Sequence, residues 1–143
     1  MATERPWANQ RRASVSTWTL KTLFDSSVLI DHLRGESKAT EMLLSTGRQD
    51  RFASVLSRIE LEGGMRSGER SAVAALFATM TLLPVTDGIA RRAGEFLRTH
   101  RRTHPGIDII DYAIAATAEI HGAQLVTLNV KHFPMSPGLV RPW

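Results

Sequence analysis

Residues 22–35 read TLFDSSVLIDHLRG, and this stretch decides the fold of the chain. An apolar run stops at Asp25, and the apolar residues behind it recur with the three-to-four residue spacing of a helix. They are Val28, Leu29 and Leu33. Gly35 follows, at the place where many helices end, because glycine adopts a left-handed backbone without strain. The stretch therefore predicts a strand over residues 18–24, an acid at its carboxyl end and a helix behind it.

The same alternation of short apolar runs and helical segments continues along the chain. Further strands are expected over residues 51–56, 82–86 and 124–128, with a short fifth strand at 139–141. Helices are expected over residues 36–44, 57–64, 69–80, 87–99 and 108–121. Strands that alternate with helices favour a parallel sheet with helices on its faces. The sequence therefore predicts one α/β domain with a central, mostly parallel sheet of four to five strands.

The composition sets limits on the kind of protein. A chain of 143 residues with 43% hydrophobic and 22% charged residues is typical of one globular domain. Cysteine is absent, which excludes disulfides and thiolate metal sites and fits a reducing cytoplasm. No apolar run approaches the roughly 20 residues that span a bilayer, so no membrane association is expected.

The positive charge of the chain is concentrated at its start. Residues 1–21 carry +3 of the net charge of +4. We expect this segment to be a flexible extension, or the product of a start codon placed upstream of the true one, with an RNA-contacting arm as the alternative. The folded domain is then expected to span residues 22–143.

Polar residues stand where the predicted strands end. Asp25 follows the first strand, Glu60 lies one turn past the second, Asp111 lies in the first turn of the helix from residue 108, and Asn129 follows the fourth strand. Ligand sites of such sheets form at the carboxyl ends of the strands. Three carboxylates and an amide are therefore expected at one edge of the sheet.

Each acid also has a purely structural interpretation. Asp25 could cap the helix behind it. Ser57 and Glu60 match a capping box, and Asp108 and Asp111 could cap their helix and complement its dipole. Taken singly, each acid fits capping better than catalysis.

Taken together, the acids favour a cation-binding site over helix capping. Ser26 and Ser27 already supply good caps, so Asp25 is not needed as one. The small residues behind Asp111 would let its helix approach the sheet closely, and they are Ala113, Ala115, Ala116 and Ala118. Carboxylates that crowd together repel one another unless a cation neutralises them. Oxygen ligands without cysteine favour Mg²⁺ or Mn²⁺.

Four stretches resemble the PIN-domain nucleases, specifically the VapC-type toxins. They are FDSSVLID at 24–31, SRIEL at 57–61, DYAIAATA at 111–118 and LVTLNVKHF at 125–133. The resemblance implies a three-layer α/β/α PIN-like fold and a Mg²⁺- or Mn²⁺-dependent endoribonuclease, the toxin of a type II toxin–antitoxin system. It also implies a cognate antitoxin, an RNA substrate and a homodimer. The alternative is a non-catalytic RNA-binding module of PIN type.

The resemblance assigns roles to individual residues. Asp25, Glu60 and Asp111 take the places of the metal-binding acids, with Asp25 and Asp111 as direct ligands and Glu60 as a ligand or as the holder of the attacking water. Ser27, Thr127 and Asn129 are expected to support the acids. Asn129 stands where many members have a further acid, so the site holds either one ion or two. Asp108 is either an additional acid of the site or a plain helix cap.

Two surfaces are expected to bind partners, and each of them also has a purely structural interpretation. RNA contacts are expected from a basic run that could equally be a solvated helix face. Its candidates are Arg91, Arg92, Arg98, Arg101 and Arg102, with His100 and His104 in the same run. An apolar groove for the antitoxin is expected on the first two helices, unless its residues are plain core. Its candidates are Val28, Leu29, Leu33, Leu43 and Leu44.

A receiver domain would also place an acid at a strand end. That fold needs an acceptor aspartate after its third strand, where this chain offers Asp87 at best. Nucleotide-binding folds are excluded because no glycine fingerprint follows any predicted strand.

Overall fold

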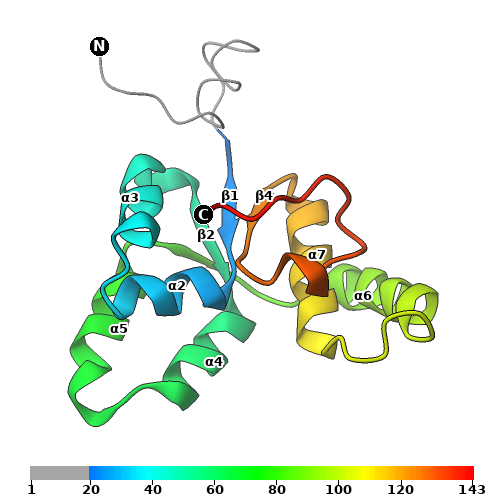
Figure 1. Cartoon of the computed structure of the whole chain (residues 1–143), viewed down its shortest axis with the longest axis horizontal. Helices are drawn as coiled ribbons and strands as arrows, with labels where there is room; N and C mark the ends of the chain where they lie inside the picture. Colours follow the sequence, from blue (N-terminus) through cyan, green and yellow to red (C-terminus); the bar gives the residue numbers. More distant parts are fainter. Residues whose placement is uncertain (1–19) are drawn as a thin grey trace.

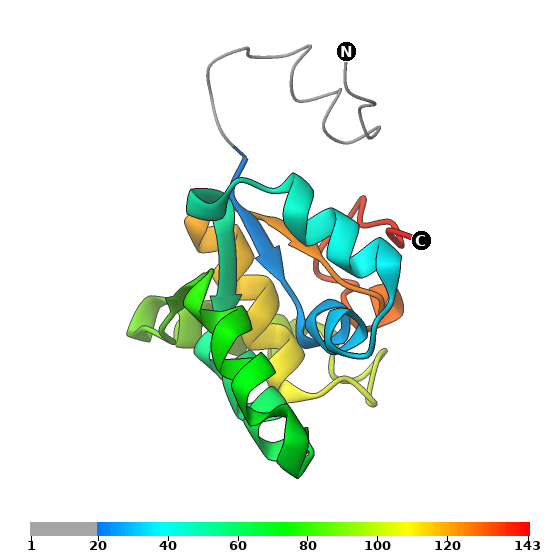
Figure 2. The same cartoon turned by 90° about the vertical axis from the view of Figure 1, so that its left-hand side faces the viewer.

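A computed structural model describes residues 20–143, so the extension expected at residues 1–21 lies almost wholly outside the described residues. The strands are β1 (Thr22–Phe24), β2 (Arg51–Ser54), β3 (Thr81–Leu83) and β4 (Gln124–Val126). They form one parallel sheet in the order β3-β2-β1-β4. Figure 2 shows the strands running in one direction through the molecule.

Helices lie on both sides of this sheet (Figure 1). One group is α2 (Ser26–Leu33), α3 (Ser37–Ser45), α4 (Val55–Gly64) and α5 (Arg70–Ala78). The other is α6 (Asp87–His100) and α7 (Ile109–His121). Three short 3₁₀ turns are η1 (Arg48–Asp50), η2 (Ser67–Glu69) and η3 (Val130–His132). The arrangement confirms the three-layer α/β/α fold expected from the sequence.

The central strand β1 separates two hydrophobic cores. Successive residues of a strand point to opposite faces of a sheet. Leu23, which is fully buried, belongs to the core under α6 and α7, and Phe24, equally buried, belongs to the core under α2 to α5. A strand that is buried on both faces therefore delivers the residue after it, Asp25, into the interior of the molecule.

Several element ends differ from the sequence prediction because the caps lie elsewhere. Ser54, rather than Ser57, caps α4 by accepting the Leu56 N–H at 3.0 Å, so the predicted capping box was wrong. By contrast, α6 begins at residue 87 as predicted, and Thr86 caps it by accepting the Ile89 N–H at 3.2 Å. The strands β2 and β3 end earlier than their apolar runs, at Ser54 and Leu83.

The expected fifth strand at residues 139–141 is also wrong: within the described residues the sheet has four strands. Pro137 and Pro142 flank this segment, and proline cannot donate a backbone hydrogen bond to a neighbouring strand. By contrast, α7 ends as its sequence predicts, at Gly122 with a φ of 62°. Among residues 20–143, no helix has both the length and the apolar character needed to cross a bilayer.

Candidate active site

Asp25 lies at the carboxyl end of β1 with 4% of its surface exposed. It occupies the cap position of α2, yet its side chain makes no capping hydrogen bond. Its Oδ2 instead accepts hydrogen bonds from Thr127 Oγ1 at 2.7 Å and from Ser27 Oγ at 3.1 Å. The Asp25 carboxylate is therefore held by two hydroxyl groups, and its placement is not explained by helix capping.

Ser27 and Thr127 also connect Asp25 to the chain behind β4. The Leu128 N–H donates to Ser27 Oγ at 3.0 Å, and the Asn129 N–H donates to Thr127 Oγ1 at 3.0 Å. Asn129 contributes its backbone N–H to this network, where the sequence suggested its side chain. The end of β1 and the loop after β4 are thus joined through polar side chains that face the same acid.

Glu60 projects from α4 toward this group. The residue is exposed as a whole, but partial desolvation of its carboxyl group raises its pKa. Hydrogen bonding with Ser26 lowers that pKa, whereas the charges of Asp25 and Asp108 raise it. Glu60 is therefore close enough to two other acids to be affected by their charges.

Asp111 lies in the first turn of α7 and is largely buried. Desolvation raises its pKa to about 6, and the charges of Asp25, Asp108 and Glu60 add to this effect. His132 acts in the opposite direction, with its Nδ1 at 3.3 Å from Asp111 Oδ2. The structure therefore brings together the three acids that the sequence placed at the strand ends.

Asp108 combines the two roles that the sequence left open. Its Oδ1 caps α7 by accepting the Ile110 N–H at 2.9 Å. Its charge also raises the pKa of both Glu60 and Asp111. Asp108 is thus a helix cap at the margin of the acidic group.

His132 was not among the residues singled out as part of the site. The available signal was its spacing: it stands one turn after Asn129 and directly before Phe133, which is 2% exposed. A buried aromatic residue there fixes the turn η3 against the core and turns the preceding side chain outward. Sequence alone does not reveal that this direction leads to Asp111.

The donor set suits a hard divalent cation. Its oxygen ligands would come from Asp25, Asp111 and Glu60, and mutual repulsion of their charges favours a cation between them. Among residues 20–143, no three acidic, histidine or cysteine side chains already stand close enough to hold an ion together.

The basic run divides into two parts. Arg92 pairs with Glu119 on α7 and with Glu95, and its guanidinium lies 4.3 Å from the centre of the Phe96 ring. Hydrogen bonding to Glu119, and then to Glu95, raises the pKa of Arg92, and the Glu119 contact joins α6 to α7. The other candidates are exposed and make no ion pair with any described residue; they are Arg91, Arg98, Arg101 and Arg102.

The pKa of Asp111 leads to a prediction about stability. An aspartate whose pKa is higher in the folded chain binds its proton more tightly there than in the unfolded chain. Its ionisation therefore costs stability as the pH rises from about 4, the ordinary value, to about 6, and the cost remains at higher pH. We expect the melting temperature of the metal-free wild type, relative to Asp111→Asn, to fall across this window and then stay level. A difference that does not change with pH would show that Asp111 ionises as it does in water.

Comparison with known proteins agrees with this fold. A family model described as PIN domain matches residues 22–133. Ribonuclease VapC10 of Mycobacterium tuberculosis is 49% identical over 122 residues, which cover 85% of this chain and 92% of the relative. Ribonuclease VapC19 of the same organism is 44% identical over 85% of this chain and 98% of the relative.

A solved structure gives the same result. One chain of a toxin–antitoxin complex from Klebsiella pneumoniae superposes with a TM-score of 0.73 and 26% identity, covering 86% of this chain and 98% of that one. The chain therefore belongs to the PIN-domain family. Within this family, the two curated relatives named above are VapC ribonucleases.

Proposed function

We propose that the chain is a Mg²⁺- or Mn²⁺-dependent endoribonuclease and the toxin of a toxin–antitoxin pair. The observation that carries the proposal is the buried Asp25 carboxylate at the end of β1, which Ser27 and Thr127 hold by hydrogen bonds and whose charge raises the pKa of both Glu60 and Asp111. The relatives that bear the name ribonuclease VapC support it. Cleavage of RNA by the purified chain, compared with an Asp25→Asn variant, tests the proposal.

The side chains of the acidic group would have different roles in hydrolysis. Asp25 and Asp111 would hold the cation, with Ser27 and Thr127 keeping the Asp25 carboxylate in place. When bound, the cation supplies charge for the phosphate and lowers the pKa of water. Glu60 either adds a further ligand or accepts a hydrogen bond from the attacking water. No Ser, Cys or His nucleophile is needed for this chemistry.

The non-catalytic alternative explains the acids less well. A module that only binds RNA gains nothing from a group of neighbouring carboxylates, because they repel one another and the phosphate backbone. Homodimerisation and action in the cytoplasm belong to the same proposal and rest on the family resemblance.

We propose that the exposed arginines after α6 contact RNA phosphates. Replacing both Arg101 and Arg102 with Ala, in an inactive Asp25→Asn background, should weaken RNA binding. It should also flatten the slope of log affinity against log salt by about 1.4, because two fewer phosphates are neutralised and each contributes about 0.7 on single-stranded RNA. Arg92→Ala should leave the slope unchanged, because Arg92 is committed to Glu119 and Glu95. Equal slopes for the double variant and its parent would show that Arg101 and Arg102 only face solvent.

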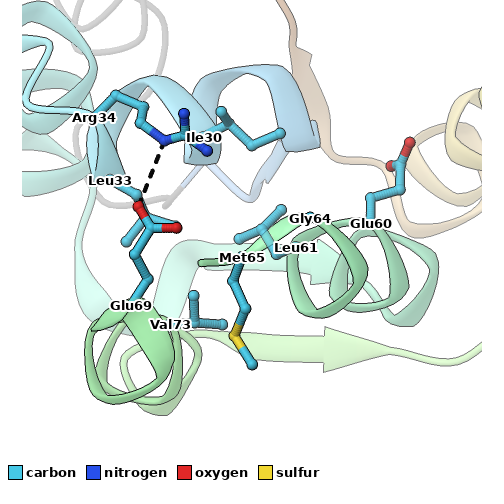
Figure 3. A pocket seen from close by; sticks show the side chains of 9 residues that line it. All are labelled: Ile30, Leu33, Arg34, Glu60, Leu61, Gly64, Met65, Glu69 and Val73. Atoms are coloured by element: carbon cyan, nitrogen blue, oxygen red, sulfur yellow. Dashed lines mark ion pairs between the residues drawn. The ribbon is translucent and has the colours of Figure 1, made fainter. Parts of the chain in front are cut away.

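We propose that an antitoxin segment docks in the pocket between α2, α4 and α5 (Figure 3). The pocket has a volume of about 130 Å³ and an apolar lining. The apolar residues that line it are Ile30, Leu33, Leu61, Met65 and Val73. Glu60 lies at one end of the pocket, and Arg34 pairs with Glu69 at 3.6 Å across the other.

This geometry determines what the segment should carry. An apolar side chain would fill the pocket, and an Arg or Lys beside it would reach Glu60 and the other acids. Of the groove residues expected from the sequence, Leu33 lines the pocket. Val28 and Leu29 are fully buried in the core, which is the alternative that the sequence left open for them. Leu43, which is nearly fully buried, and Leu44, which is exposed, line a different pocket between α2, α3 and α5, and Leu33 borders that pocket as well.

A further inference from the structure

The segment after β4 contacts two of the three acids. Thr127, at its start, donates a hydrogen bond to Asp25 Oδ2 at 2.7 Å. His132, at its end, places Nδ1 at 3.3 Å from Asp111 Oδ2. Asp25 follows β1 and Asp111 lies on α7, so these acids belong to separate parts of the fold. One short segment therefore bridges the two carboxylates that are proposed to hold the cation.

The backbone of this segment is fixed at both ends. At the start, the Asn129 N–H donates to Thr127 Oγ1 at 3.0 Å. At the end, the His132 N–H donates to the Asn129 carbonyl at 2.9 Å, and Phe133 is buried in the core under α6 and α7. His132 thus stands on a rigid turn and has few orientations in which its ring can reach Asp111.

The His132 ring can serve Asp111 in either protonation state. Nδ1 can carry a hydrogen toward Asp111 Oδ2, 3.3 Å away, both in a neutral imidazole and in an imidazolium. The side chain of His132 is 41% exposed and that of Asp111 is 19% exposed, so the contact lies at the mouth of the site. A ring at this distance limits the positions that the Asp111 carboxylate can take.

We propose that His132 is a positioning residue: together with Thr127 it sets the orientation of Asp111 relative to Asp25, and thereby the affinity of the site for a divalent cation. The inference rests on the proposed function, because it concerns the same acids. Side chains that orient metal ligands from behind typically change metal affinity by about 10- to 100-fold when they are removed. His132 acts through Asp111 and takes no part in the chemical step.

Calorimetric titration of the purified chain with Mn²⁺ tests this role. His132→Ala should weaken Mn²⁺ binding by about 10-fold or more, as expected for the loss of an orienting partner. His132→Asn should stay within about threefold of the wild type, because its amide nitrogen can replace Nδ1 as a donor to the carboxylate. His121→Ala is the matched control: His121 stands at the far end of α7 from Asp111, and its removal should change nothing.

Cleavage kinetics separate positioning from a direct chemical role. At saturating Mn²⁺, His132→Ala should recover a kcat near that of the wild type, with an unchanged KM for RNA. A kcat that stays low at saturating Mn²⁺ would make His132 a catalytic residue and overturn the inference. Unweakened Mn²⁺ binding in His132→Ala, or equal losses in the Ala and Asn variants, would overturn it as well. A wild type that binds no Mn²⁺ at all would overturn the proposed function, and this inference with it.

Discussion

Asp111→Asn is expected to abolish RNA cleavage and growth arrest while leaving the fold intact. The substitution keeps the size of the side chain and removes the charge, so the site loses a cation ligand. Activity should fall by more than the roughly 10- to 100-fold that loss of an outer supporting contact costs. Asp25→Asn should have the same effect, because Asp25 is the buried acid that affects both of its neighbours.

Stability distinguishes this result from simple unfolding. Removing one of several mutually repelling carboxylates relieves repulsion, so the metal-free Asp111→Asn variant should melt at the same temperature as the wild type or somewhat higher. The control is Asp87→Asn, which removes an exposed acid at the start of α6 and should leave cleavage unchanged. Loss of helical circular dichroism in Asp111→Asn would make the acid a structural residue, and retained cleavage would remove it from the site.

Gly64→Leu is expected to release the chain from its antitoxin. Gly64 lines the pocket between α2, α4 and α5, and a Cβ added there meets no atom within 4 Å. The new side chain would enter the space that an antitoxin side chain needs. Loss of a central anchoring contact costs about 2 kcal/mol or more, which weakens binding by about 30-fold. Cells that co-express the antitoxin with this variant should then stop growing.

The neighbouring glycine supplies a matched control. Gly63 lies on the same helix, a Cβ added to it also meets no atom within 4 Å, and it does not line the pocket. Gly63→Leu therefore makes the same change in helix propensity and should leave neutralisation intact. Both variants should retain nuclease activity in the absence of antitoxin. Equal neutralisation of the Gly63 and Gly64 variants would show that the antitoxin binds elsewhere.

Local patterns predict the positions of the acids well. The end of an apolar run placed Asp25 after β1, and helical spacing placed Asp111 in the first turn of α7. Both predictions depend on chain segments of about ten residues. The parallel sheet then brings these positions to one edge, which is why the group could be expected without any knowledge of its distances.

Contacts between distant residues could not be predicted in the same way. His132 reaches Asp111 across 21 residues, and Arg92 reaches Glu119 across 27, through pairings that only the packed helices create. The apolar spacing of α2 also does not show which of its apolar residues lie in the core and which line a pocket. Val28 is fully buried whereas Leu33 lines the pocket, and the difference depends on what covers each side of the helix.

The most direct test of a cation site at Asp25, Glu60 and Asp111 is whether RNA cleavage depends on a divalent metal ion. The purified wild-type chain, freed of antitoxin, is incubated with RNA in the presence of a chelator and then again after Mg²⁺ or Mn²⁺ is added back. If Asp25, Glu60 and Asp111 hold the cation, cleavage by the wild type should stop with the chelator and return with either ion. The Asp25→Asn variant, whose fold is checked by circular dichroism, should not cleave RNA under either condition. Cleavage that continues in the chelator, or that the ions restore equally in Asp25→Asn, would contradict a cation-dependent site built on Asp25, Glu60 and Asp111.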